Sequence, residues 1–321
     1  MSMTTSNTSL LTRAEIWSSE LKEVLQDDLF GMGYVDFLTE FPDGTQFTIP
    51  SIGDALVDDY TEDQAVNYRP MDTGEWTFTI DEYLSSGTYI TKKAEQDIYY
   101  MNQLVSGFVP KQRRAIMEHF EKTMFEKPEA IYSANAQGAI NGAYHRMAGG
   151  NGGIIELADF AYANYALDKA NVPAQNRVAI VDPSVGFTFE TLSNLVSVSN
   201  NPMWEGIVSE GIHSGLKFVK NVYGFDVYVS NRLPAVTDSA LPERDGSTTK
   251  DFSSTNGVAN YFFSATSDIL PWKGAWRQMP EVDMEYNKDY QRTEFVTTAR
   301  YGVKLFRPEN MVTVVTNPTI S

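Results

Sequence analysis

Cysteine and histidine set the first limits on the chemistry open to this 321-residue chain. Cysteine is absent, which excludes disulfides, thiolate nucleophiles and zinc sites built on cysteine. The histidines are His119, His145 and His213, and they lie far apart in the sequence. A three-histidine zinc site would need all of them together. We therefore expect no metal site.

A serine nucleophile is the one catalytic group that a short motif approaches. Residues 211–215 read Gly-Ile-His-Ser-Gly, whereas a nucleophile elbow needs Gly-x-Ser-x-Gly, so Ser214 stands one position late. His213 adjoins it in the sequence, but catalytic triads are assembled from distant residues. We expect no catalytic residue. The alternative from the enzyme class is a soluble hydrolase in which His213 gathers with a serine and a carboxylate in a pocket.

Glycine-rich and acidic segments are the remaining candidates for binding phosphates, cofactors or metals. The chain has no Gly-x-x-x-x-Gly-Lys phosphate loop, and residues 149–153 lack the lysine and preceding strand that such a loop needs. The turn after Val181 lacks the Gly-x-Gly-x-x-Gly pattern of a dinucleotide site. The acidic pairs 27–28 and 58–59 would point apart on a helix or strand, which indicates solvated surface charge. We expect no cofactor-binding residue.

The net charge limits the partners. The chain carries −17 at pH 7, whereas a protein that binds nucleic acid needs Lys and Arg to replace counterions. Acidity keeps a protein soluble, and it also suits a protein that encloses DNA without adhering to it. The basic group Lys111, Arg113 and Arg114 is either a solvated helix face or an ion-pairing contact with another subunit. No apolar run reaches the roughly 18 residues of a membrane span, and the N-terminus does not read as a signal peptide.

The first part of the chain predicts a polar arm, a short helix and a protruding hairpin. Thr12 and Glu15 have the spacing of a capping box, which predicts a helix over about 12–30. Two strands are predicted near 47–50 and 76–80, where the second alternates cleanly between apolar and polar residues. A long polar connection between them leaves strand edges exposed, which is a liability unless a neighbouring subunit covers them.

Residues 91–127 give the strongest helical signal in the chain. Apolar residues recur there at steps of three and four, as on one face of a helix. Gly107 and Pro110 interrupt this pattern and should kink the helix, because proline removes a backbone hydrogen bond. A helix of this length exceeds the average of globular proteins, which indicates an elongated subunit.

The rest of the chain mixes helices and strands, so the fold class is α+β, not an alternating βαβ pattern. A helix over 154–171 should present one apolar face, made of Ile154, Leu157, Ala158, Ala161 and Tyr165. The remaining expectations are an irregular stretch 128–153, a buried strand 178–181, a helix capped by Asp182 and Pro183, a hairpin 217–229, a mobile surface loop 237–258, and strands at 282–286, 295–306 and 311–316.

Two segments and the order of elements resemble the HK97-type capsid fold of tailed-bacteriophage major capsid proteins. Residues 223–234 read Tyr-Gly-Phe-Asp-Val-Tyr-Val-Ser-Asn-Arg-Leu-Pro, and residues 298–309 read Thr-Ala-Arg-Tyr-Gly-Val-Lys-Leu-Phe-Arg-Pro-Glu. Each is similar to a strand familiar from short-tailed and related phage capsid proteins. The resemblance covers nearly the whole chain, and it is strengthened because both segments follow a hairpin and a long helix in that order.

The resemblance implies a division of the chain into five parts. They are an N-terminal arm 1–45, an extended hairpin loop 46–90, a spine helix 91–130 of the peripheral domain, an axial domain 131–278, and returning strands 279–321 of the peripheral domain. The arm and the hairpin loop should reach adjacent subunits, and the loop 237–258 should face a capsomer axis or the outer surface. Gly107 and Pro110 should let one chain fit both pentamers and hexamers.

The resemblance also implies partners and a location. The chain would assemble with copies of itself into pentamers and hexamers of an icosahedral head that encloses double-stranded DNA without sequence-specific binding, with no membrane partner. Some family members carry a cleaved N-terminal scaffolding segment that has no room here, so we expect a separate scaffolding protein, a portal and decoration proteins. The location would be the virion, assembled in the host cytoplasm. The alternative on the same fold is an encapsulin-type nanocompartment, which holds protein cargo instead of DNA.

Overall fold

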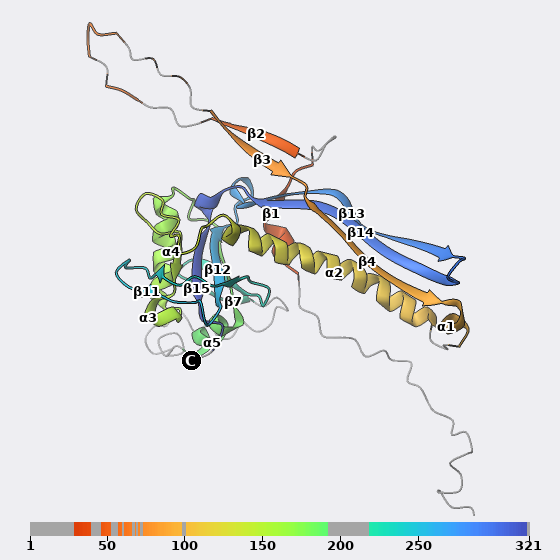
Figure 1. Ribbon diagram of the computed structural model, residues 1–321. Helices are drawn as coiled ribbons and strands as arrows, with labels where there is room; N and C mark the ends of the chain where they lie inside the picture. Colours follow the sequence, from red (N-terminus) through yellow and green to blue (C-terminus); the bar gives the residue numbers. More distant parts are fainter. Residues whose placement is uncertain are drawn as a thin grey trace, which may run out of the picture.

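A computed structural model describes residues 29–39, 46–52, 57–59, 61–65, 68, 70, 73–97, 101–191 and 218–319. Within these residues the chain has a mixed α/β architecture with two main sheets, a separate hairpin and one long helix (Figure 1). The helix over 12–30 that the capping box predicted lies outside the described residues.

The first sheet is a long, narrow ribbon. Its strands are β1 (Val35–Phe37), β13 (Trp272–Asn287), β14 (Arg292–Leu305) and β4 (Glu82–Thr91), in the order β1-β13-β14-β4. β13 and β14 form an antiparallel hairpin with two irregularities between Trp276 and Glu281. β1 is parallel to β13 but pairs only with residues 272–274, so most of the ribbon is three strands wide.

The long helix α2 (Met101–Ala130) follows the short helix α1 (Lys92–Asp97) and packs along one face of the ribbon (Figure 1). Phe120 of α2 lies edge-on to Tyr301 of β14, with ring centroids 4.9 Å apart, and Thr297 donates a hydrogen bond to Gln112 at 3.2 Å. α2 is continuous through Gly107 and Pro110, and the kink expected there stays a prediction. Packing on the sheet supplies most of a helix's stability in proteins, which offsets one missing backbone donor.

A separate two-stranded hairpin projects away from both sheets (Figure 1). β2 (Gln46–Ile52) pairs antiparallel with β3 (Thr73–Thr79), which confirms the strands predicted near 47–50 and 76–80. β4, which lies at the end of the expected loop segment 46–90, pairs with β14 of the ribbon and not with the hairpin.

The second sheet has seven strands in the order β5-β15-β12-β6-β8-β7, with β9 added on β12. Alternate side chains of a strand point to opposite faces of its sheet, and in β12 the side chains on both faces pack against a helix. Tyr261 packs on Phe125 of α2, whereas Phe262 packs on Phe160 of the helix α4 (Leu157–Lys169). The strands are β5 (Arg146–Ala148), β6 (Arg177–Val181), β7 (Phe218–Val222), β8 (Phe225–Val229), β9 (Ala235–Val236), β12 (Gly257–Ser264) and β15 (Val312–Thr316).

Several local predictions for this second sheet are confirmed. All five residues of β6 are buried, as the apolar run at 178–181 predicted. β7 and β8 form the expected hairpin, with Tyr223 and Gly224 at positive φ in its turn. The helix α5 (Pro183–Thr191) is capped as predicted, because the Asp182 carboxylate accepts the Ser184 N–H at 2.9 Å.

The predicted apolar face of α4 is wrong. Ala158, Ala161 and Tyr165 are exposed, and the buried face carries Phe160, Ala163, Ala166 and Leu167. The buried residues recur at steps of three and four just as the predicted ones do, so helical spacing alone allows either face. The choice is made by tertiary packing, because Phe160 lies against Phe225 and Phe262 of the second sheet.

Three further expectations need correction. The stretch 128–153 is not irregular throughout, because α2 extends to Ala130, β5 pairs in parallel with β15, and Gly150–Gly153 form the short helix α3. The loop 237–258 contains paired strands β10 (Leu241–Pro242) and β11 (Thr249–Lys250), and its Leu241 and Phe252 are fully buried. β15 belongs to the seven-stranded sheet, although the sequence grouped it with the returning strands of the ribbon.

Candidate assembly site

A buried carboxylate fixes the backbone at the start of the described chain. Glu121 of α2 is only 1% exposed, and its Oε1 accepts hydrogen bonds from the backbone N–H groups of Gly31 at 2.7 Å and Phe30 at 3.1 Å. Its Oε2 accepts from Arg232 at 3.2 Å. We call Glu121, Arg232, Phe30 and Gly31 the N-terminal clamp. It holds the chain directly after residues 1–28 against the long helix.

Aromatic rings complete the N-terminal clamp. Phe30 stacks on Tyr228 with centroids 5.8 Å apart, and Tyr34 lies edge-on to Phe263 at 5.2 Å. Burial, reinforced by neighbouring Tyr228, raises the pKa of Tyr34 well above its ordinary value, so its phenol stays neutral. Tyr228 and Arg232 both come from the segment 223–234 that carried the resemblance.

A second set of contacts holds the base of the β2–β3 hairpin on β14. The Trp76 ring lies edge-on to Phe306 with centroids 4.8 Å apart, and Lys304 donates to the Thr77 carbonyl at 2.7 Å. Phe78 is fully buried beneath them. We call Trp76, Phe78, Lys304, Phe306 and Gly302 the hairpin clamp. Gly302, Lys304 and Phe306 come from the second resembling segment, so each of the two segments anchors one extension of the chain.

Gly302 sets how closely the hairpin approaches β14. A Cβ atom there would lie 2.6 Å from the Thr79 carbonyl oxygen and 3.0 Å from the Ile80 Cα, both backbone atoms that cannot rotate away. Gly302→Val is therefore expected to lower the free energy of unfolding by about 1–3 kcal/mol, the usual range for overpacking. Urea unfolding followed by tryptophan fluorescence measures this loss.

Gly87 provides the matched control for Gly302. It lies in β4 of the same sheet, and a Cβ there would meet a Val296 methyl at 3.8 Å and the Phe295 carbonyl oxygen at 3.9 Å, both ordinary contacts. Gly87→Ala should therefore leave stability unchanged or slightly higher. Equal losses in Gly302→Val and Gly87→Ala would show that the close approach of the hairpin does not explain the glycine.

A buried ion cluster ties the end of α2 to the seven-stranded sheet. Arg146 of β5 donates to Glu129 at 2.8 Å and to Asp238 at 2.5 Å, and all three side chains are largely buried. Its guanidinium also lies 5.6 Å from the Tyr132 ring centroid. Burial raises the pKa of Glu129, and the charge of Arg146 opposes that rise. The cluster thus joins α2, which carries Glu121 of the N-terminal clamp, to the second sheet.

The histidines considered for chemistry do not form a site in the described residues. His119 of α2 has its Nδ1 3.0 Å from the hydroxyl of Tyr301 in β14, whereas His145 is buried directly before β5. His213 and Ser214, on which the hydrolase alternative depends, lie outside the described residues. Across the described ranges no group of three or more His, Asp or Glu side chains is arranged to hold a metal.

The other charged candidates have simple surroundings. Arg114 pairs with Glu118 one turn along its own helix, at 3.0 Å, so that member of the basic group is bound within its own subunit. Asp58 and Asp59 are exposed, as expected for surface charge, and the pair 27–28 lies outside the described residues. Of the described helices, none is long and apolar enough to span a bilayer.

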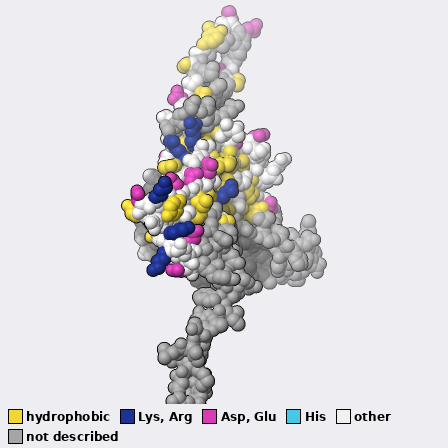
Figure 2. Space-filling model, turned by 90° about the vertical axis from the view of Figure 1, so that its right-hand side faces the viewer, with side chains coloured by type: hydrophobic (Ala, Val, Ile, Leu, Met, Phe, Trp, Pro, Cys, Tyr) yellow, Lys and Arg dark blue, Asp and Glu magenta, His cyan; other side chains and the backbone are white. Residues whose placement is uncertain are grey.

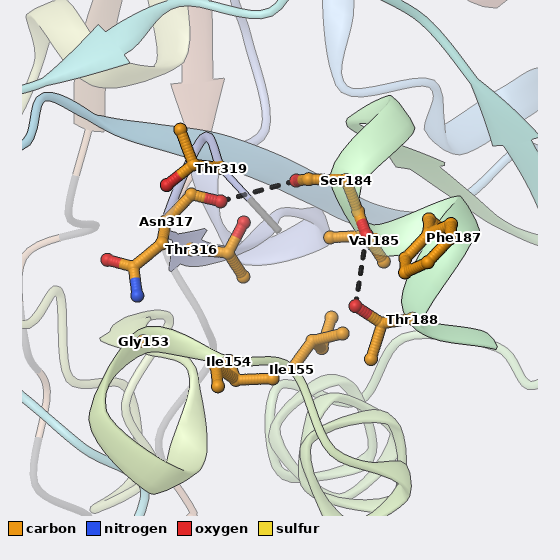
Figure 3. Close-up of a pocket in the computed structure, with 10 residues that line it drawn as sticks. All are labelled: Gly153, Ile154, Ile155, Ser184, Val185, Phe187, Thr188, Thr316, Asn317 and Thr319. Carbon is orange, nitrogen blue, oxygen red and sulfur yellow. Dashed lines mark hydrogen bonds between the residues drawn. The ribbon is translucent and has the colours of Figure 1, made fainter. Parts of the chain in front are cut away.

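A small cavity of about 90 Å³ opens between α3, α5 and the end of β15 (Figure 3). Its lining holds no titratable side chain. The Ser184 hydroxyl donates to the Asp182 carboxylate at 2.6 Å and lies 3.2 Å from the Asn317 carbonyl oxygen. The Thr188 hydroxyl donates to the Ser184 carbonyl at 3.0 Å. The short bond from Ser184 belongs to the cap of α5, where the same carboxylate also accepts the Ser184 N–H.

His145 makes the second sheet sensitive to acid. Burial lowers the pKa of His145 below its ordinary value, so the unfolded chain binds a proton there more readily than the folded chain does. Stability is therefore expected to fall as the pH drops below about 6.5, the ordinary histidine pKa. Unfolding in urea between pH 7.5 and 5 tests this. His145→Gln should flatten that part of the profile, and an unchanged slope would contradict the assignment.

Sequence reasoning missed the clamps and the ion cluster. Arg232, Gly302 and Lys304 lie in the two segments that resemble capsid proteins, and those segments were the sequence signal that pointed to the clamps. No sequence pattern pointed to their acidic and aromatic partners, because Glu121, for example, lies 90 residues from Gly31 and 111 residues from Arg232.

The comparisons with known proteins agree with this architecture. A model of the phage capsid protein family matches residues 74–314, and no curated protein matches the chain. A structure from Mycobacterium phage Che8 has a TM-score of 0.66 at 17% identity, covering 96% of this chain and 98% of that one. The capsid structure of Cyanophage P-SCSP1u has a TM-score of 0.66 at 15% identity, covering 98% and 94%.

A third structure comes from the mature capsid of bacteriophage PhiM1. It has a TM-score of 0.64 at 12% identity, covering 97% of this chain and 94% of that one. At such identities the likeness to these structures shows the fold, whereas the family model covers most of the chain and shows the family. The chain belongs to the phage capsid protein family, which confirms the resemblance to tailed-phage major capsid proteins.

Proposed function

We propose that this chain is the shell subunit of a tailed-phage head with the HK97-type fold. Copies assemble into pentamers and hexamers, and these close into an icosahedral shell around double-stranded DNA. The subunit is a structural protein and performs no reaction. Assembly takes place in the host cytoplasm, and the product is the capsid of the virion.

The observation that carries the proposal is the projecting β2–β3 hairpin. Among the described residues it is held to its own subunit at its base, through the hairpin clamp and the packing of Phe47 near Phe78, and its strands pair only with each other. A hairpin with two open edges is a liability in an isolated protein, because each edge can pair with another chain. Such a hairpin makes sense where a neighbouring copy covers it.

The parts of such a subunit would be the arm 1–45, the extended loop 46–90, the spine helix 91–130, the axial domain 131–278 and the returning strands 279–321. Within this division β4 pairs with the ribbon and β15 with the seven-stranded sheet. α2 provides the spine, the ribbon provides the peripheral domain, and the seven-stranded sheet provides the core of the axial domain. The N-terminal clamp supports the arm, because it fixes the backbone at the point from which the arm would reach a neighbour.

The subunit's partners follow from the same proposal. They are further copies of the chain, a separate scaffolding protein, a portal and decoration proteins. DNA is enclosed without being bound by sequence, in keeping with the net charge of −17.

Negative-stain electron microscopy with light scattering tests the proposed function. The protein would be purified after expression alone and together with its neighbouring open reading frames. We expect closed shells, or pentamers and hexamers that close when a scaffolding protein is supplied. A monomer of 35.9 kDa under every condition would contradict the proposal. Shells from infected cells that hold protein cargo instead of DNA would favour a nanocompartment.

A further inference from the structure

The ribbon has two outer edges, and they are built differently. Beyond residue 274, β13 has no neighbour on its outer side among the described residues, and neither has β4 along its whole length. An unpaired edge presents backbone N–H and C=O groups that can bind another strand. Whether an edge does so depends on the residues that guard it.

The β13 edge is guarded. Its register with β14 shifts twice between Trp276 and Glu281, and Pro280 removes one backbone donor. Acidic side chains then alternate along the face turned away from α2, at Glu281, Asp283 and Glu285. Irregularities, proline and charge are the devices by which proteins prevent strand addition at an edge. A second acidic copy would also be repelled there.

The β4 edge carries none of these devices. Its pairing with β14 runs without a shift from Glu82 to Thr91, and the segment contains no proline. Glu82, at one end, is its only charged residue. At about 3.4 Å per residue this leaves roughly 30 Å of regular, uncharged edge.

The surroundings of β4 leave room for another strand. α2 packs mainly over β14, the middle strand, and no β4 residue is fully buried. On the face turned away from α2, Tyr83 and Tyr89 are 66% and 57% exposed and flank Ser85 and Gly87, two residues with small side chains or none. Seen from the ribbon tip, hydrophobic side chains are interspersed with basic and acidic ones (Figure 2).

Tyr89 is held in place at this surface. The Arg292 guanidinium lies 4.5 Å from the Tyr89 ring centroid and 4.7 Å from that of Tyr290. Glu294 accepts from the same guanidinium at 2.6 Å, which limits its movement. An exposed tyrosine held in this way loses little conformational freedom when another chain packs on it.

We propose that the free edge of β4 is an interface to which an extended strand of a second copy of this chain adds. The inference rests on the proposed shell function, which supplies the second copy at high local concentration. The choice of occupant follows from charge. Two copies at −17 each repel one another, and β4 is the long edge of the ribbon along which they can approach without opposing rows of acidic side chains.

The added strand binds through main-chain hydrogen bonds. The side chains of the added strand pack between Tyr83 and Tyr89, and these contacts set its register, as in other cases of β-strand addition. The ribbon would thereby continue from one subunit into the next. β13 remains a terminal edge, because its shifts, Pro280 and acidic row exclude a partner.

Paired proline substitutions test the edge. Successive backbone N–H groups of a strand point to opposite sides, so of Ser85 and Ser86 one donates toward β14 and the other toward the free edge. Ser85→Pro and Ser86→Pro are compared by urea unfolding. The variant that keeps near-normal stability has lost only the outer donor. We expect that variant to form shells at least tenfold less efficiently than the unsubstituted chain.

Asp283→Pro and Met284→Pro on β13 are the matched controls, because they make the same change on the guarded edge of the same ribbon. The more stable variant of that pair should assemble normally. Normal assembly by the stable β4 variant would overturn the inference. Failure of the unsubstituted chain to form shells would instead overturn the proposed function, so the two failures are distinguishable.

Crosslinking identifies the occupant even if both β4 proline variants fail to fold. The chain has no cysteine, so Ser85→Cys gives a single attachment point for a benzophenone maleimide. Shells are assembled from equal amounts of ¹⁵N-labelled and unlabelled protein, irradiated and digested. Mixed-isotope crosslinks from residue 85 to an extended segment of this chain support the inference. Crosslinks confined to one isotope, to a different protein, or absent would overturn it.

Discussion

Replacing Glu121 with alanine is expected to cost about 3–5 kcal/mol of folding free energy, the usual loss when one partner of a buried ion pair is removed. The substitution leaves the guanidinium of Arg232 without its buried carboxylate and the N–H groups of Phe30 and Gly31 without their acceptor. Urea unfolding measures the loss. Hydrogen exchange should also accelerate at the amides of residues 30 and 31, because the N-terminal clamp is what protects them.

Glu118→Ala is the control for that experiment. Glu118 lies one turn earlier on α2 and approaches the same Arg232 at 3.5 Å, but its side chain is 37% exposed. Its loss should cost less than about 1 kcal/mol, as is usual for exposed pairs. Similar losses in the two variants, or unchanged exchange at residues 30 and 31 in Glu121→Ala, would contradict the assigned role of Glu121.

Arg146→Met should likewise lower the free energy of unfolding by about 3–5 kcal/mol at neutral pH, because it leaves two buried carboxylates without their positively charged partner. Glu129 and Asp238 would lose their shared partner at the junction of α2 and the seven-stranded sheet. Denaturant titration of both proteins measures the difference. Lys122→Ala, which removes an exposed pair with Glu126 on the same helix, should cost at most about 1 kcal/mol.

The cost of Arg146→Met should shrink as the pH falls. Burial already raises the pKa of Glu129, and without Arg146 the main opposing influence is lost, which leaves only the hydrogen bond with Thr313 to lower that pKa. A carboxyl group whose pKa is higher in the folded than in the unfolded chain gains stability on protonation, so acid favours the folded variant relative to the original. A loss that stays constant from pH 7.5 to pH 5 would contradict this reading of the cluster.

Regular elements could be predicted because their periodicity is local. The alternation at Trp76–Ile80 and the apolar run at Val178–Val181 each identified a strand from five or fewer residues. The same reasoning failed for α4, where two faces have helical spacing and the packing of Phe160 on the second sheet decides which one is buried. The local sequence pattern also could not assign β15 to its sheet, since an apolar run of β-branched residues fits the ribbon as well as the seven-stranded sheet.

The candidate site was harder to predict than the fold, for a physical reason. Glu121, Arg146 and Gly302 act through partners that are distant in the sequence, and a glutamate on a helix reads the same whether it is solvated or buried. The two resembling segments located one half of each clamp. The other half depends on how β14 and α2 bring the hairpin and the first described residues together, which requires the folded structure.

Cryo-electron microscopy of particles assembled from this chain most directly tests the central claim that it is a shell subunit whose projecting hairpin serves its neighbours. We expect an icosahedral shell made of this chain, in which each β2–β3 hairpin, held at its base by Trp76 and Phe306, lies across a second copy. A reconstruction in which the hairpin packs on its own subunit and contacts no other copy would contradict the claim, as would a shell made of a different protein.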